Sequence, residues 1–105
     1  MIITQEIKTI TETIRKAVPA EKIYLFGSYA YGEPNENSDY DFYIVVPDGS
    51  MRPIEVMQEA AVAVYPLNLG KPIDVMANYR SRFDELKQLI TLERTVDRKG
   101  VLVYG

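Results

Sequence analysis

The stretch SDYDFYIVV, residues 38–46, constrains the fold most, because it combines a buried strand with two carboxylates. Its aromatic and β-branched residues favour a β-strand, and the turn sequence PDGS at 47–50 ends it. Side chains alternate between the two faces of a strand, so Asp39 and Asp41 are predicted to share one face. The apolar residues beginning at Tyr40 then share the other face. A strand that should be buried therefore begins with two acids on one side.

Two carboxylates held close together repel each other, and one resists ionising unless a cation lies between them. The apolar strand predicted at 73–77, IDVMA, contains a third acid, Asp74, and a buried carboxylate needs a partner. If the two strands are neighbours, Asp74 completes a three-carboxylate cluster, whose oxygen ligands suit Mg²⁺ or Mn²⁺. The alternatives are that the first two acids are solvated at an exposed strand end, and that Asp74 pairs with an arginine in the core. Three further acids in turns are predicted to face solvent: Glu33, Glu36 and Asp48.

The composition narrows the possible chemistry. The 105-residue chain has no cysteine and no histidine, which excludes disulfides, thiolate metal sites and histidine-based catalysis. Carboxylates are then the only strong metal ligands. A net charge of −3 disfavours binding to nucleic acid mainly through its phosphates. No apolar run approaches membrane-spanning length and the N-terminus lacks the order of a signal peptide, so a cytoplasmic protein without membrane contact is expected.

The remaining elements predict a single α+β domain over residues 1–105. Apolar residues at helical spacing from Ile3 to Val18 predict a helix that ends at Pro19. A strand is predicted at 22–28, and a strand or extended tail at 101–104. With the strands at 38–46 and 73–77, the expected architecture is a small mixed β-sheet with helices packed against it.

Two more helices are predicted from their capping residues. Ser50 is expected to cap the first, with Pro53 in its first turn, and Ser81 with Asp84 resembles a capping box for the second. Each helix has an expected inward-facing stripe. These stripes are Ile54, Met57, Ala61 and Val64 in the first helix, and Phe83, Leu86 and Ile90 in the second, with Leu89 as a further candidate.

A glycine-serine pair follows the strand at 22–28, as phosphate-binding turns do. Gly27 allows close approach of the backbone to a ligand, and Ser28 offers a backbone N–H and a hydroxyl to a phosphate oxygen. The sequence is neither a Walker loop nor a dinucleotide-binding fingerprint. Four cations are candidates for contacts to a phosphate by their position, although each is also an ordinary surface charge: Arg52, Lys71, Arg80 and Arg82.

Taken together, these motifs resemble the signature of the nucleotidyltransferase superfamily that includes DNA polymerase β. The resemblance rests on Gly27-Ser28 followed, after ten intervening residues, by Asp39-x-Asp41. The SDYD sequence at 38–41 and the IDV sequence at 73–75 are similar to the family pattern too. The short length is similar to that of the minimal nucleotidyltransferases (MNT proteins). These are commonly encoded beside a HEPN-domain partner as toxin–antitoxin pairs.

The resemblance implies a nucleotidyltransferase fold and a set of roles. Asp39 and Asp41 would hold two Mg²⁺ ions that bridge ATP, Asp74 would complete the metal site nearer the attacking hydroxyl, and Gly27 and Ser28 would cradle the β- and γ-phosphates. The expected reaction transfers AMP to a hydroxyl group of a HEPN toxin, and the expected acceptor residue is a tyrosine. Two alternatives remain open: a catalytically idle antitoxin that acts by occlusion, and transfer to a small molecule held by a separate subunit.

Overall fold

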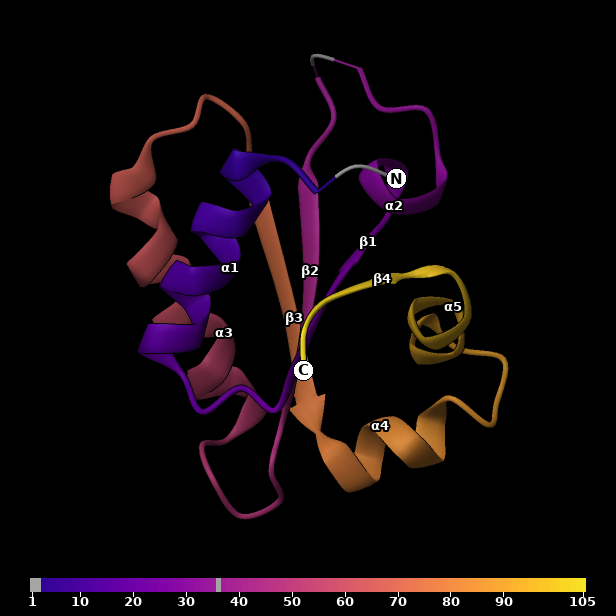
Figure 1. Cartoon of the computed structure of the whole chain (residues 1–105). Coiled ribbons are helices and arrows are strands. Elements are labelled where there is room, and N and C mark those ends of the chain that lie inside the picture. Colours follow the sequence, from indigo (N-terminus) through magenta and orange to yellow (C-terminus); the bar gives the residue numbers. More distant parts are fainter. Residues whose placement is uncertain (1–2, 36) are drawn as a thin grey trace.

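The computed structural model describes residues 3–35 and 37–105, and shows a four-stranded mixed sheet with helices on both faces (Figure 1). The elements are α1 (Gln5–Ala17), β1 (Lys22–Phe26), α2 (Ser28–Tyr31), β2 (Tyr40–Val46), α3 (Pro53–Val64), the 3₁₀ turn η1 (Tyr65–Leu67), β3 (Ile73–Tyr79), α4 (Arg80–Leu86), α5 (Leu92–Lys99) and β4 (Val101–Tyr104).

The strand order in the sheet is β3-β2-β1-β4. β1 pairs antiparallel with β2 and β4, whereas β2 and β3 run parallel. The α+β architecture predicted from the sequence is confirmed.

The two central strands are buried from both sides, which explains their nearly continuous apolar sequences. Helices α1 and α3 cover one face of the sheet (Figure 1). On that face Phe42 and Ile44 of β2 belong to the same buried core as Ile10 and Ile14 of α1. Helices α4 and α5 lie on the other face, and their core residues are packed with those of β1 and β2: Tyr24, Phe26, Tyr43, Val45, Phe83 and Val96. Within the described residues, no helix is long and apolar enough to cross a membrane.

The strands differ from their predicted bounds at the ends that matter for the site. β1 ends at Phe26, because Gly27 leaves the extended conformation and Ser28 already begins the short helix α2. β2 begins at Tyr40, so Asp39 lies immediately before it. β3 continues to Tyr79, and residues 101–104 form a strand paired with β1 rather than a free tail.

The predicted inward stripe of α3 is right for Val64, partly right for Met57, and wrong for Ile54 and Ala61. The buried residues are Val56, Ala60 and Val64, whereas Ile54 is 52% exposed. Met57 is partly buried against the core and Ala61 is exposed. The polar residues of this helix, Glu55, Gln58 and Glu59, are spaced at i, i+3 and i+4 and so share the side opposite the buried residues, a signal that the predicted stripe did not use.

The prediction that Ser50 caps α3 is also wrong. The Ser50 hydroxyl donates to the carbonyl of Pro47 within the preceding turn, and Arg52 occupies the N-cap position.

The segment after β3 forms two short helices, where the sequence suggested one. Ile90 and Leu89 fall in the connection between α4 and α5, and are 94% and 56% exposed, so their predicted burial is wrong. Phe83 is buried as predicted, Leu86 is partly buried, and Val96 of α5 completes the packing.

The expected capping box of α4 does not form. The Ser81 N–H donates instead to Asp48 Oδ1 at 3.0 Å, so the first turn of this helix is satisfied by an acid from the β2–α3 turn. Asp48 is exposed, as predicted, and so is Glu33, whereas Glu36 lies outside the described residues.

A hydrogen bond between Tyr43 and Glu93 ties α5 to the sheet. The Tyr43 hydroxyl donates to Glu93 Oε2 at 2.7 Å, and Tyr43 is 1% exposed. Burial and this bond to Glu93 raise the pKa of Tyr43. We expect Tyr43→Phe to lower the free energy of unfolding by about 1–2 kcal/mol, because a bond to a charged acceptor is lost with little change in volume. Urea denaturation measures this. Tyr31→Phe, at a tyrosine that is 43% exposed, serves as the control and should leave the midpoint unchanged.

Candidate active site

Strand pairing brings two of the three predicted acids together, and Asp39 lies just before the paired residues of β2. Asp41 of β2 and Asp74 of β3 are opposite each other in the parallel ladder, so the two strands are neighbours, as the cluster hypothesis required. Tyr40 and Phe42 pack into the core on the α1–α3 face, and Asp41, which alternates with them, points to the opposite face. The same alternation places Asp74 on that opposite face, since its neighbours Ile73 and Val75 pack with the core.

The Gly27 turn lies directly against this group of acids. Phe26, the last residue of β1, pairs with Asp41, and the chain then turns through Gly27 at φ +75°. A Cβ atom at Gly27 would lie 2.2 Å from Asp41 Oδ2. Only glycine is free of strain there and leaves room for the carboxylate. Gly27 and Ser28 are thus beside the acids, and Ser28 begins α2.

The acids influence one another electrostatically. Burial raises the pKa of Asp41, and the negative charges of Asp74 and Asp39 raise it further. Asp74 is an exposed residue, yet partial burial of its carboxyl is still the largest cause of its raised pKa, followed by the charge of Asp39 and a hydrogen bond with its side chain. Both shifts mean that the folded protein disfavours the fully ionised cluster.

The donor set fits a hard divalent cation in its chemistry. It consists of carboxylate oxygens whose mutual repulsion a cation would relieve. Among residues 3–35 and 37–105, however, no three acidic side chains are already gathered as metal ligands. A cation would therefore have to draw the Asp39, Asp41 and Asp74 side chains closer together, in place of the present contact between Asp39 and Asp74.

The four candidate cations lie at two different ends of the sheet. Arg52 follows the C-terminal end of β2, while Arg80 and Arg82 follow that of β3. Each of these arginines has an acidic partner: Arg52 pairs with Glu55, Arg80 with Glu21 and Arg82 with Glu85. Lys71 precedes β3 and so lies at the end where Asp74 is found. Of the four, position favours Lys71 alone.

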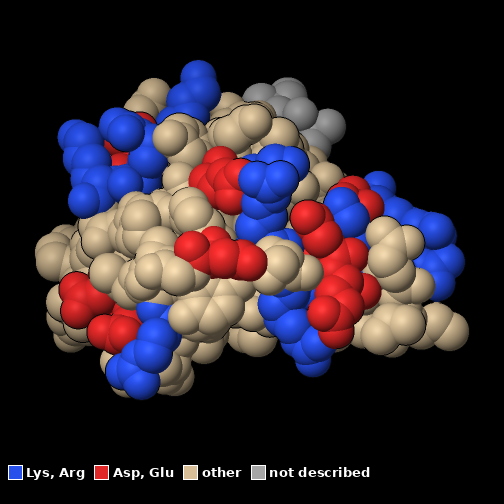
Figure 2. Space-filling model, turned by 90° about the horizontal axis from the view of Figure 1, so that it is seen from below, with Lys and Arg blue, Asp and Glu red and all other residues tan. Residues whose placement is uncertain are grey.

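Figure 2, which views the molecule from below Figure 1, shows basic and acidic side chains interspersed on that face. No field of one sign covers it, whereas a surface that holds nucleic acid by its phosphates is uniformly basic.

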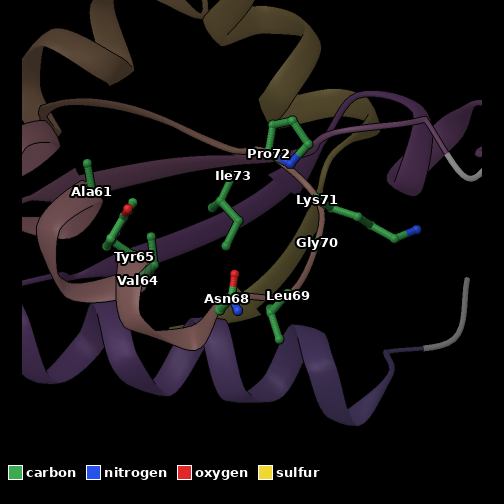
Figure 3. Close-up of a pocket in the computed structure, with 9 residues that line it drawn as sticks. All are labelled: Ala61, Val64, Tyr65, Asn68, Leu69, Gly70, Lys71, Pro72 and Ile73. Atoms are coloured by element: carbon green, nitrogen blue, oxygen red, sulfur yellow. The ribbon is translucent and has the colours of Figure 1, made fainter.

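A pocket of about 460 Å³ lies where η1 leads into β3. Neither the three aspartates of the predicted site nor Gly27 and Ser28 line it. Its walls come from the end of α3, η1 and the loop before β3, as Figure 3 shows. Lys71 belongs to the lining, but its side chain extends away from the other side chains of the pocket (Figure 3).

Reasoning from the sequence did not find the contacts that Lys71 makes with Tyr29 and Tyr40, nor the hydrogen bond from Tyr40 to Glu6. The signal available was that each tyrosine adjoins a predicted site motif: Tyr29 follows Ser28, and Tyr40 separates Asp39 from Asp41.

Three solved structures resemble this fold over nearly the whole chain. A toxin–antitoxin crystallised with AMP-PNP has 21% identity and a TM-score of 0.65, covering 93% of this chain and 72% of its own. A mutant of the toxin–antitoxin MntA–HpeT has 22% identity and a TM-score of 0.66, with the same coverage. A candidate nucleotidyltransferase from Sulfolobus solfataricus has 21% identity and a TM-score of 0.62, covering 92% of this chain and 75% of its own.

No curated protein sequence matched the chain. A family comparison did: residues 8–104 match the family described as Polymerase beta, Nucleotidyltransferase. This match spans almost the whole chain and includes the Gly27-Ser28 turn and the three aspartates, Asp39, Asp41 and Asp74. The chain therefore belongs to the polymerase beta nucleotidyltransferase family.

Proposed function

We propose that this nucleotidyltransferase uses Asp39, Asp41 and Asp74, with Gly27 and Ser28, to transfer AMP from ATP to a hydroxyl group. The observation that carries the proposal is the meeting of three chain segments at one point. Gly27 adjoins the Asp41 carboxylate, and Asp41 lies opposite Asp74 in the ladder. A phosphate-binding turn beside clustered carboxylates is the arrangement that phosphoryl and nucleotidyl transfer needs, since such reactions depend on positioning and charge neutralisation.

In this proposal the three aspartates hold Mg²⁺, or Mn²⁺, which when bound would neutralise the triphosphate and polarise its α-phosphorus. The residues of the chain have their own tasks. Gly27 keeps the backbone close to the phosphates because it has no side chain, and Ser28 offers its N–H and hydroxyl to the β- and γ-phosphates. Asp39 and Asp41, which lie beside this turn, would orient the triphosphate through the metal that they hold.

The proposed reaction is an in-line displacement. The acceptor oxygen forms a bond to the α-phosphorus, the bond from that phosphorus to the oxygen bridging to the β-phosphate breaks, and pyrophosphate leaves. The proton of the acceptor hydroxyl goes to the Asp74 carboxylate.

We further propose that the acceptor is a tyrosine of a partner toxin of the HEPN type, and that this chain is the antitoxin. Two similar structures are toxin–antitoxin proteins, one of them with a nucleotide analogue, AMP-PNP. The MntA–HpeT mutant carries two aspartate-to-glutamate changes two positions apart, the spacing of Asp39 and Asp41 in this chain. A protein acceptor would also bring a binding surface of its own to this site.

The test is to incubate this protein and the HEPN protein encoded beside it, if one is present, with Mg–ATP, and to weigh the partner by intact mass spectrometry. We expect additions of the mass of AMP on the partner, because the proposed transfer leaves a phosphodiester there. Asp39→Asn should abolish them, and Glu59→Gln, at an exposed acid of α3, should not.

Full neutralisation of the partner without any mass change, by wild type and Asp39→Asn alike, would favour the idle antitoxin. Transfer to an added small hydroxyl compound in place of the protein would favour the small-molecule enzyme.

A further inference from the structure

The three segments that carry the proposed site are joined by one cluster of side chains on the opposite face of the sheet. Tyr29 follows Ser28 on α2, Tyr40 begins β2 between the two aspartates, and Lys71 precedes β3, three residues before Asp74. All three side chains contact one another. We call Tyr29, Tyr40 and Lys71, with Glu6 of α1, the tyrosine–lysine cluster.

The contacts of the cluster are close. The Lys71 Nζ atom donates to the Tyr29 hydroxyl at 2.6 Å, and lies 5.3 Å from the centre of the Tyr29 ring and 5.9 Å from that of Tyr40. The two rings are 4.5 Å apart between centres. A cation that contacts two aromatic faces and one phenol is held by several interactions at once.

The cluster is also fixed to its surroundings. The Tyr40 hydroxyl donates to Glu6 Oε1 of α1, and Tyr40 is 5% exposed. The Tyr40 N–H donates to the carbonyl of Pro72 at 3.0 Å, next to Lys71 in the chain. The start of β2 and the loop before β3 are therefore linked by backbone and side-chain contacts together.

Helix α2 depends on contacts with the rest of the fold. It has four residues, none of them fully buried, and the glycine at its N-cap has no side chain to cap it. The N–H groups of Ala30 and Tyr31 donate to the Gly27 carbonyl and that of Gly32 to the Ser28 carbonyl, while Tyr29 and Ala30 pack against the core. A helix this short is unstable by itself, so tertiary contacts such as that of Tyr29 hold it in place.

We infer that the tyrosine–lysine cluster positions the Gly27-Ser28 turn relative to the three aspartates, and that Lys71 acts through Tyr29 rather than by contact with the triphosphate. This inference rests on the proposed function for its meaning in catalysis. The effect of the Lys71–Tyr29 contact on the order of the turn is testable without that function. Lys71 and Tyr29 are positioning residues in this account. The extension of Lys71 away from the neighbouring pocket is consistent with that role (Figure 3).

The first experiment measures hydrogen exchange at the amides of Ala30, Tyr31 and Gly32 by fast mixing. Removing the bond between Lys71 and Tyr29, by Lys71→Met or Tyr29→Phe, should speed exchange there by about tenfold, the change expected for one charge-assisted hydrogen bond. The double variant should be no faster than Lys71→Met alone, because Lys71→Met already removes the bond to the Tyr29 hydroxyl. Tyr31→Phe, on the same short helix, should match the wild type.

The second experiment measures binding of Mg–AMP-PNP by calorimetry in the same variants. If the turn must be held against the acids, Tyr29→Phe should weaken binding by about tenfold and Lys71→Met by at least as much, because Lys71→Met also removes the contacts with both rings. Lys71→Arg keeps the cation and a donor and should restore most of the affinity, a result that a general loss of stability would not give.

The outcomes distinguish failure of the positioning role from failure of the proposed function. Faster exchange in both variants supports the coupling, even if the wild type fails to bind Mg–AMP-PNP, and in that case only the proposed function is lost. Weaker binding in Lys71→Met, with unchanged exchange and binding in Tyr29→Phe, would overturn the inference and make Lys71 a direct phosphate ligand. Unchanged exchange in both variants would overturn it as well.

Discussion

Gly27→Ala is expected to abolish nucleotide transfer, whereas Gly49→Ala is expected to leave it close to that of the wild type. Both glycines have nearly the same positive φ, +75° and +74°, so both substitutions force an L-residue into a backbone region that it disfavours. The surroundings differ. The Cβ atom at Gly27 would lie 2.2 Å from Asp41 Oδ2, and at Gly49 nothing lies within 4 Å.

This pair of variants separates backbone strain from obstruction of the site. Each should lose stability by about 1–3 kcal/mol from a backbone conformation that an L-residue disfavours, and Gly27, at ψ −157°, lies in a region almost restricted to glycine. Gly27→Ala must in addition displace the Asp41 carboxylate or the turn itself, which moves a proposed ligand away from the acids beside it. Misplacement of a reacting group by about 1 Å can cost about 100-fold in rate, and here the turn and a carboxylate would move together.

The measurement is AMP transfer to the partner at saturating Mg–ATP, with urea denaturation of both variants in parallel. We expect transfer to fall by more than 100-fold in Gly27→Ala under conditions in which urea denaturation shows both variants to be fully folded. Equal activity of the two variants would show that the close approach of Gly27 to Asp41 has no part in the reaction.

The main features of the fold follow from patterns that the sequence displays strongly. The run YDFYIVV is apolar on both faces because β2 is a central strand with helices on each side. The alternation that separates Asp41 from Tyr40 and Phe42 is a property of any strand, so the direction of the acids was predictable. That Asp74 would be the neighbour of Asp41 was only a condition in the argument, because the order of strands in a sheet depends on contacts between distant segments.

The buried side of α3 was predictable but was assigned wrongly, because Glu55, Gln58 and Glu59 mark the exposed side and Val56 and Ala60 lie opposite them. Other features that the sequence did not predict were decided by tertiary contacts. The start of α4 is capped by Asp48, which is 33 residues away from Ser81 in the chain. No local pattern reports such a contact. The tyrosine–lysine cluster has the same character, since it joins residues from four separate elements or loops.

Asp41→Asn is expected to eliminate AMP transfer and, at the same time, to stabilise the folded protein in the absence of metal. Loss of transfer follows from the removal of a central charge of the site, and we expect a fall of at least about 10²–10³. The gain in stability follows from the raised pKa of Asp41, because the folded state disfavours the ionised form of a carboxyl whose pKa it raises.

The sign of this effect depends on pH. Below the pKa of an unfolded aspartate, about 4, Asp41 is protonated in both states and the substitution should change little. As pH rises through that value and then through the raised pKa of the folded state, the wild type acquires the full penalty of an ionised Asp41. The asparagine variant never acquires it. We therefore expect equal thermal midpoints near pH 3 and a higher midpoint for Asp41→Asn at pH 7.

Thermal unfolding with and without Mg²⁺ completes the test. A cation that binds the folded aspartates should raise the midpoint of the wild type with increasing concentration, because binding to the folded state alone shifts the equilibrium by mass action. Asp41→Asn should lose most of this response, and the control Glu59→Gln should keep it. The wild type would then be less stable than the variant without metal and would approach or pass it as Mg²⁺ is added. A variant less stable than the wild type at pH 7 without metal would contradict the repulsion at Asp41. A variant that kept the full response to Mg²⁺ would remove Asp41 from the proposed metal site.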